Sequence, residues 1–187
     1  MPPAPTPLRP AVFIDRDGVI IENRSDYVKS VAEARFIPGA LEALARLAAR
    51  DYAIVIVTNQ SPIGRGLVSP AVSDAINAYV RQQIVAAGGR LDGLYVCPHR
   101  PEAGCACRKP APGMLLAAAA DLGLDLAASV MIGDALSDVQ AGLRAGARAI
   151  LVLTGRGADQ ARGLAPAGLA AVPVAADLAA ALDALAL

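Results

Sequence analysis

Short apolar runs recur along this chain, and three of them end directly at a polar residue. These runs cover residues 11–14, 52–57 and 130–132, and they are followed by Asp15, by Thr58 and by Gly133-Asp134. A strand of a parallel sheet is buried on both faces and is therefore apolar along its whole length. Ligands of such sheets bind in the crevice beyond the carboxyl ends of the strands. The pattern predicts a parallel sheet with a polar site at one edge.

Helical patterns separate the apolar runs. Strands are predicted at residues 11–14, 52–57, 94–96, 130–132, 149–153 and 172–174, and helices from Pro38-Gly39, over 70–87, 112–122 and 135–145, and from Asp177. Met114, Leu115 and Leu116 are expected in the core, and residues 155–168 form a Gly/Ala-rich loop. Alternating strands and helices predict a Rossmann-like three-layer α/β/α fold with a central parallel sheet. Residues 11–187 are expected to form a single domain without a large cap domain, preceded by a disordered proline-rich arm over residues 1–10.

Composition excludes several classes of function. The 187 residues carry 17 basic and 17 acidic side chains, so whole-molecule attraction to nucleic acid or to an anionic membrane is not indicated. Apolar residues make up 55% of the chain, but no uninterrupted run reaches the roughly eighteen residues of a membrane span. The first ten residues contain five prolines and do not resemble a secretion signal. We therefore expect a cytoplasmic monomer that acts on a small molecule.

Four stretches of the chain together contain the parts of a phosphoryl-transfer site. They are Asp15-Arg16-Asp17-Gly18, Thr58-Asn59-Gln60-Ser61, Arg108-Lys109-Pro110 and Gly133-Asp134. Asp and Gly commonly begin loops after strands, so one of these stretches alone would be weak evidence. Taken together they predict a Mg²⁺ site in which one carboxylate attacks phosphorus and a second transfers protons. Lys109 and Thr58 would hold the phosphoryl oxygens.

The three cysteines of the chain cluster beside its one histidine. Cys97, His99, Cys105 and Cys107 lie within eleven residues. Three thiolates and one imidazole suit a closed, tetrahedral, structural Zn²⁺ site, although three buried cysteines beside a surface histidine would give the same sequence. Arg108 and Lys109 follow Cys107 directly, so bound zinc would orient Lys109. A second reading is a non-catalytic nucleic-acid-binding module built on this loop, against which zero net charge and 3% aromatic residues argue.

The four polar stretches resemble motifs I to IV of the haloacid dehalogenase superfamily of phosphatases, over residues 12–154. This resemblance implies that Asp15 is the nucleophile and Asp17 the general acid/base. It implies that Mg²⁺ is held by Asp15, by the backbone carbonyl of Asp17 and by Asp134. Thr58 and Lys109 match the hydroxyl of motif II and the cation of motif III.

The cysteine–histidine loop is similar to that of zinc-bearing members of this superfamily that act on heptose 1,7-bisphosphate or on histidinol phosphate. The resemblance implies a sugar phosphate substrate, with histidinol phosphate as the alternative. The implied substrate-binding residues are Arg16, Arg24, Ser25, Asp26, Tyr27, Asn59, Gln60, Ser61, Arg65 and Arg108.

The sequence does not settle the roles of several other charged residues near the motifs. Asp138, four residues after Asp134, either caps a helix or takes part in the site. Arg65 is favoured as a contact to the distal phosphate of a bisphosphate, whereas ordinary surface charge is the favoured explanation for Arg24 and Arg100. Gly155-Arg156-Gly157 lacks the Lys and Ser/Thr of a phosphate-binding loop, so we interpret it as a turn.

Overall fold

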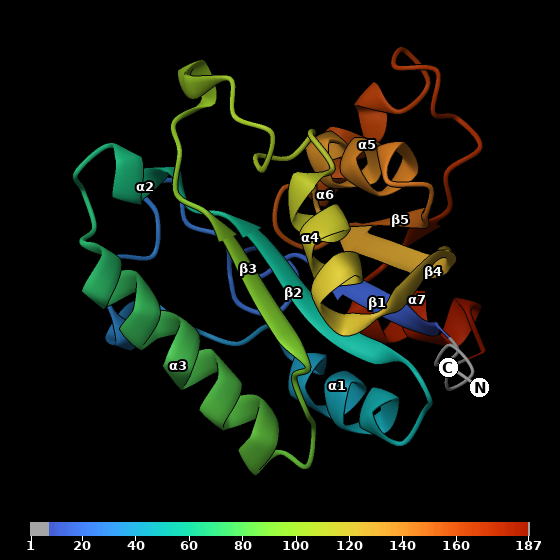
Figure 1. Cartoon of the computed structure of the whole chain (residues 1–187), viewed down its shortest axis with the longest axis horizontal. Helices are drawn as coiled ribbons and strands as arrows, with labels where there is room; N and C mark the ends of the chain where they lie inside the picture. The colour runs from blue at the N-terminus through green and yellow to red at the C-terminus, as the bar shows by residue number, and fades with distance from the viewer. Residues whose placement is uncertain (1–7, 187) are drawn as a thin grey trace, which may run out of the picture.

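Residues 8–186 are described by the computed structural model, and they build a six-stranded parallel sheet in the order β3-β2-β1-β4-β5-β6 (Figure 1). The strands are β1 (Arg9–Ile14), β2 (Ala53–Asn59), β3 (Gly93–Cys97), β4 (Leu124–Gly133), β5 (Arg148–Val152) and β6 (Val174–Ala175). The longer helices are α1 (Ala40–Ala48), α3 (Pro70–Ala86), α4 (Gly113–Leu122), α5 (Leu136–Arg144) and α7 (Leu178–Ala184). The shorter ones are α2 (Ser61–Gly64) and α6 (Gly157–Gln160), with 3-10 turns at Val31–Glu33, Pro101–Ala103 and Ala161–Gly163. The predicted three-layer α/β fold is confirmed.

The two faces of the sheet are covered by separate hydrophobic clusters, and a third cluster, smaller than the other two, lies around β5. Val12 and Ile14 of β1 pack with α1, α3 and α7, whereas Ala11 and Phe13 pack with α4 and α5. Successive side chains of a strand point to opposite faces, so an apolar run of four residues supplies both cores. Burial of each Ile or Phe side chain contributes roughly 1.5–3 kcal/mol to the free energy of folding, so this central strand stabilises the packing of both helical layers.

Helix boundaries follow local chemistry that the sequence displays. Ser69 caps α3, because its hydroxyl accepts a hydrogen bond from the Val72 N–H at 3.2 Å, and Pro70 occupies the first helical position. Asp177 caps α7 in the same way by accepting from Ala180 N at 2.8 Å. Gly123, at φ 64°, ends α4 in the left-handed conformation that glycine adopts without strain.

Four local predictions need correction. β1 begins at Arg9, inside the segment predicted as a disordered arm, and residues 1–7 of that arm lie outside the described residues. β4 begins at Leu124, because Arg9 and Pro10 pair with its first residues before the register shifts. Leu116 is exposed, since consecutive helical residues are rotated by about 100° and three in a row cannot all face the sheet. The Gly/Ala-rich loop contains α6.

Parallel pairing brings the ends of the strands to a common edge. Ile14 of β1 is in register with Ile56 of β2 and with Ile132 of β4. Asp15, Val57 and Gly133 therefore follow at the same level, and the loops after β1, β2, β3, β4 and β5 meet there. Over residues 8–186 the helices and loops cover this one sheet, and no separate cap domain forms.

Among the described helices, none combines the length and the apolar character that crossing a membrane requires.

Candidate active site

A polar cavity of about 400 Å³ opens at the carboxyl edge of the sheet. Its lining includes most of the predicted site residues: Asp15, Asp17, Tyr27, Thr58, Asn59, Ser61, Arg65, Arg108, Lys109 and Asp138. Another cavity, of about 500 Å³, is lined mainly by apolar side chains around the start of β5 and the end of α7. Because the chemistry-bearing side chains converge in the polar cavity, it is the candidate active site.

Lys109 lies at the base of this cavity between two carboxylates. Its Nζ atom is 3.0 Å from Asp15 Oδ1 and 2.7 Å from Asp138 Oδ1, and it donates to the Val57 carbonyl at 2.7 Å. Burial alone would lower the pKa of Lys109, but the neighbouring Asp138 and Asp15 carboxylates raise it. Burial raises the pKa of Asp15 to about 6, against the attraction of Lys109. The lysine is therefore a fixed ammonium group with its charge facing Asp15.

Asp134 is fully buried beneath the loops that follow β1 and β5. It accepts a hydrogen bond from Arg156 N at 2.8 Å on Oδ2, and the Arg156 guanidinium lies 3.4 Å from Oδ1. A Cβ atom at Gly18 would lie 2.1 Å from Asp134 Oδ2, and one at Gly155 would lie 2.3 Å from it. Both glycines also have positive φ, so only glycine lets the two loops close on this carboxylate.

Three carboxylates are arranged to hold a hard cation. Asp15, Asp134 and Asp138 each place an oxygen within 4.8 Å of the others. Arg16 N and Lys109 Nζ both contact Oδ1 of Asp15, which leaves Oδ2 for another ligand. Asp138 is more fully engaged, because Lys109 takes Oδ1 and the Ala135 N–H donates to Oδ2 at 3.0 Å. Oxygen donors of this number and charge fit Mg²⁺. The atoms best placed to bind it are Oδ2 of Asp15 and Oδ1 of Asp134, whose contact with the Arg156 guanidinium is long at 3.4 Å.

Asp17 is held by a buried network. Arg16 donates to both carboxylate oxygens of Asp17, at 3.1 and 3.0 Å, and to Asn77 Oδ1 of α3 at 2.6 Å. Gln60 donates to Asp17 Oδ2 at 2.6 Å and to Thr58 Oγ1 at 2.9 Å. Arg16 is only 1% exposed and does not line the cavity, so its predicted contact with substrate is not supported. Its side chain instead positions Asp17.

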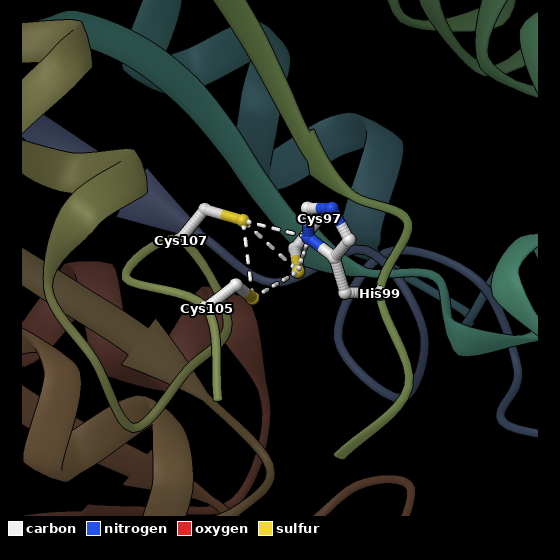
Figure 2. A group of neighbouring side chains, drawn as sticks. All are labelled: Cys97, His99, Cys105 and Cys107. Atoms are coloured by element: carbon white, nitrogen blue, oxygen red, sulfur yellow. Dashed lines mark hydrogen bonds between the residues drawn. The ribbon is translucent and has the colours of Figure 1, made fainter. Parts of the chain in front are cut away.

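The four predicted zinc ligands converge at the end of β3, as Figure 2 shows. Their sulfur atoms are 3.2 to 3.6 Å apart, and His99 Nδ1 lies 3.6 Å from Cys97 Sγ and 3.3 Å from Cys107 Sγ. Zinc–sulfur bonds of 2.3 Å imply about 3.8 Å between sulfurs in a tetrahedron, so small adjustments would admit the metal. The three thiols are free cysteines without a disulfide. Donor type and arrangement thus fit a closed structural Zn²⁺ site.

The cysteine–histidine loop is tied to the loop after β2. Asn59 bonds Lys109 twice, because its Nδ2 donates to the Lys109 carbonyl at 3.0 Å and its Oδ1 accepts from Lys109 N at 3.1 Å. Gln60 N donates to the Cys97 carbonyl at 2.7 Å. The backbone of Lys109 is therefore fixed from both sides, by Asn59 and by the loop that ends at Cys107.

The predicted 24–27 segment divides into two parts. Tyr27 lines the cavity with φ 67°, a conformation that is strained for a bulky side chain. Arg24 lies 3.1 Å from Asp26 and 3.9 Å from Glu33 at the surface, and Ser25 is exposed. Arg24, Ser25 and Asp26 are not among the lining residues of the cavity, so their predicted contacts with substrate are not supported.

Four residues of the site or its support were not predicted: Asn23, Asn77, Ser137 and Arg156. Arg156 lies in the loop after β5, four residues beyond Val152, so it does not directly follow an apolar run as Asp15 does. Ser137 follows Asp134 by three residues in the first turn of α5. Asn77 lies within α3, and nothing in its local sequence marks it as a partner of Arg16.

Comparisons with known proteins agree with this geometry. A family model described as haloacid dehalogenase-like hydrolase matches residues 10–143, and a second model of HAD-hydrolase-like proteins matches residues 106–181. A protein from Bordetella bronchiseptica named D-glycero-beta-D-manno-heptose-1,7-bisphosphate 7-phosphatase is 42% identical over 146 residues, covering 78% of this chain and 82% of the relative. A protein of the same name from Photorhabdus laumondii is 42% identical over 179 residues, covering 89% and 94%.

A solved structure extends the similarity to three dimensions. The crystal structure of D,D-heptose 1,7-bisphosphate phosphatase from B. bronchiseptica, complexed with magnesium and phosphate, matches with a TM-score of 0.88 and 40% identity. The match covers 95% of this chain and 98% of that one.

Proposed function

Because this chain belongs to the haloacid dehalogenase-like hydrolase family, we propose that it removes the C7 phosphate of D-glycero-D-manno-heptose 1,7-bisphosphate in a Mg²⁺-dependent reaction. The observation that carries the proposal is the contact of Lys109 with Asp15 in a polar cavity that also contains Asp17 and Thr58. The relatives named above, which share about two fifths of their residues with this chain, support the substrate.

The first half of the proposed reaction transfers the phosphoryl group to the protein. A carboxylate oxygen of Asp15 forms a bond to phosphorus while the bond from phosphorus to the sugar oxygen breaks. Asp17 gives its proton to the departing sugar oxygen. Lys109 and the Thr58 hydroxyl hold phosphoryl oxygens, which is most of what this kind of catalysis requires.

The second half releases inorganic phosphate. Asp17, now a carboxylate, takes a proton from a water molecule whose oxygen attacks phosphorus. The bond between phosphorus and Asp15 breaks, and the Asp15 carboxylate and the Asp17 proton are restored. Arg16 and Gln60 keep Asp17 beside Asp15 throughout, because both donate to its carboxylate.

The two proposed metals have different tasks. Mg²⁺, held by Asp15, Asp134 and the Asp17 carbonyl, would screen the charge between a carboxylate and a phosphate dianion. Zn²⁺, held by Cys97, His99, Cys105 and Cys107, leaves no open coordination position and would stabilise the loop that carries Lys109.

Substrate contacts and cellular setting complete the proposal. Tyr27, Asn59, Ser61, Arg65 and Arg108 are proposed to contact the sugar phosphate, since all five line the cavity. The protein is proposed to work as a cytoplasmic monomer without a nucleic-acid partner, because free thiols at a zinc site suit a reducing compartment and the net charge is zero.

Phosphate release from a panel of substrates tests the function. The panel contains heptose 1,7-bisphosphate, fructose 1,6-bisphosphate and histidinol phosphate, each at several concentrations with Mg²⁺. The heptose bisphosphate is expected to give the highest kcat/KM, and a higher value on histidinol phosphate would overturn the substrate assignment.

The nucleophile is tested separately. Asp15→Asn is expected to bind substrate with no measurable turnover, and rapid acid quenching of the wild type should trap labelled phosphate on Asp15. Phosphate trapped on another residue would refute this mechanism.

A further inference from the structure

Arg156 stands at the rim of the cavity, on the side formed by β5. Its N–H group is bonded to Asp134, so the residue is fixed at its backbone, while its side chain remains 53% exposed and lines the cavity. By contrast, Asp15, Lys109 and Thr58 at the base of the cavity are buried. A phosphoryl group that reacts with Asp15 meets the buried residues, and the rest of the substrate meets the rim.

The guanidinium of Arg156 has N–H donors available to bind a ligand. Among residues 8–186, its side chain forms a polar contact with Asp134 alone, where Nη2 lies 3.4 Å from Oδ1, which is long for a charge-assisted hydrogen bond. An arginine carries five N–H donors in a planar fork that matches two oxygens of a phosphate. Arg156 can therefore keep its contact with Asp134 and still bind an anion from the cavity.

Two neighbouring residues, Thr154 and Gly155, fix the position of Arg156 in the fold. Thr154 Oγ1 donates to the Gly18 carbonyl at 2.6 Å and ties the loop after β5 to the loop after β1. Gly155 has φ 58°, and a Cβ atom there would lie 2.6 Å from Gly18 Cα. These two contacts bring Arg156 to the edge of a cavity whose other rim arginines, Arg65 and Arg108, come from the loops after β2 and β3.

We propose that Arg156 binds the non-reacting phosphate of a sugar bisphosphate and so selects bisphosphates over monophosphates. The inference rests on the proposed function, since it requires that the substrate carry a second phosphate. It goes beyond that function by assigning a residue that sequence reasoning placed in a turn. The reacting phosphate lies against Asp15 and Lys109, and the second phosphate lies at the rim within reach of the Arg156 guanidinium.

The test compares two substrates that differ only in the second phosphate. kcat/KM is measured on heptose 1,7-bisphosphate and on heptose 7-phosphate for the wild type, Arg156→Ala and Arg156→Lys. Arg156→Ala is expected to lower the ratio of the two values about 10- to 100-fold, as expected for the loss of a hydrogen-bonded charge pair. Arg156→Lys keeps the positive charge but lacks the two parallel donors of the guanidinium. Its ratio is expected to lie between those of the wild type and Arg156→Ala.

The design also includes a control variant at another exposed arginine and a binding measurement without turnover. Arg162→Ala changes an exposed arginine six residues away, which pairs with Asp159 outside the cavity, and is expected to keep the wild-type ratio. Calorimetric titration with heptose 1-phosphate reports the second-phosphate contact without turnover, and Arg156→Ala should weaken this binding by a similar factor. The N–H bond to Asp134 does not depend on the side chain, so the variant is expected to fold.

The outcomes separate the two proposals. If the wild type releases no phosphate from the heptose bisphosphate, the proposed function fails and the inference falls with it. If the wild type prefers the bisphosphate but Arg156→Ala lowers both kcat/KM values equally, the proposed function stands and Arg156 acts only through Asp134. An unchanged ratio with unchanged binding of heptose 1-phosphate would likewise overturn the inference alone.

Discussion

The ammonium group of Lys109 lies closer to Asp138 than to Asp15, with Nζ at 2.7 Å from Asp138 Oδ1 and at 3.0 Å from Asp15 Oδ1. Lys109 and Asp138 are both about 1% exposed, so this is a fully desolvated pair. The sequence left open whether Asp138 is structural or functional. Its contacts suit both roles: Oδ2 accepts a hydrogen bond from Ala135 N at the start of α5, and Oδ1 contacts the lysine that faces Asp15.

Replacing Asp138 should therefore disturb the site as well as the fold. In Asp138→Asn the buried ammonium keeps only Asp15 as a charged partner, and it is expected to move toward that carboxylate. A displacement of this kind costs up to about 100-fold in rate, so we expect kcat to fall roughly 10- to 100-fold. Loss of one partner of a buried pair should also lower the free energy of unfolding by about 3 kcal/mol. Steady-state kinetics and urea unfolding measure the two effects.

Asp159→Asn is the control for this change. Asp159 is an exposed aspartate, 79% accessible and paired with Arg162 at the surface, where ion pairs contribute little. It should leave both measurements near those of the wild type. A wild-type kcat in Asp138→Asn would show that Lys109 needs no support from Asp138.

Asn77 of α3 offers a test of the network behind Asp17. Asn77→Ala removes the acceptor of a buried guanidinium donor, which costs about 1–3 kcal/mol in the free energy of unfolding. We also expect kcat to fall several-fold, because Arg16 then holds Asp17 less firmly. Ser69→Ala, which removes the N-cap of the same helix, should cost about 1 kcal/mol without changing kcat. Equal kcat values in the two variants would mean that Asn77 contributes to stability alone.

Much of this site was predictable because the chain follows simple rules at the ends of its strands. Asp15, Thr58 and Asp134 directly follow apolar runs, and parallel pairing brings the ends of such runs together whatever the details of the helices. The zinc ligands were predictable from residue type and spacing alone. Arg156 was missed because it lies four residues beyond the end of β5, inside a loop that was compared only with a phosphate-binding loop.

The predicted site residues that do not line the cavity include two long side chains whose directions the sequence did not reveal. Arg16 and Arg24 are both near the motif residues in sequence, but Arg16 turns inward to Asn77 and Arg24 turns outward to Asp26. Their directions depend on what α3 and the 3-10 turn at Val31–Glu33 present to them, and the local sequence does not contain that information. The early start of β4 is a similar case, because Arg9 and Pro10 extend it by pairing with Leu124 and Asp125.

Removing one zinc ligand should affect catalysis through Lys109. Cys107→Ser is expected to lose about one zinc per chain, as four-ligand structural sites do, and to lower both kcat and the thermal midpoint. Metal analysis by mass spectrometry and thermal unfolding check these outcomes. Cys105→Ser removes another of the four ligands, so it should lose zinc equally and reduce kcat by a similar factor. An undiminished zinc content in Cys107→Ser would disprove the assignment of the loop.

In protein freed of magnesium by dialysis, the buried Asp15 carboxylate should make the free energy of unfolding depend on pH. Burial raises the pKa of Asp15 from 3.8 to about 6, so the folded state binds this proton more tightly than the unfolded state does. The resulting contribution to stability is fully present below about pH 4 and is lost as the pH rises through 6. Asp15→Asn has no such proton to lose. The free energy of unfolding of Asp15→Asn, measured relative to that of the wild type by urea unfolding, should therefore rise by about 1–1.5 kcal/mol from pH 5 to pH 7.5. Asp159→Asn should show no such gain, and a difference between Asp15→Asn and wild type that stays constant with pH would contradict the prediction.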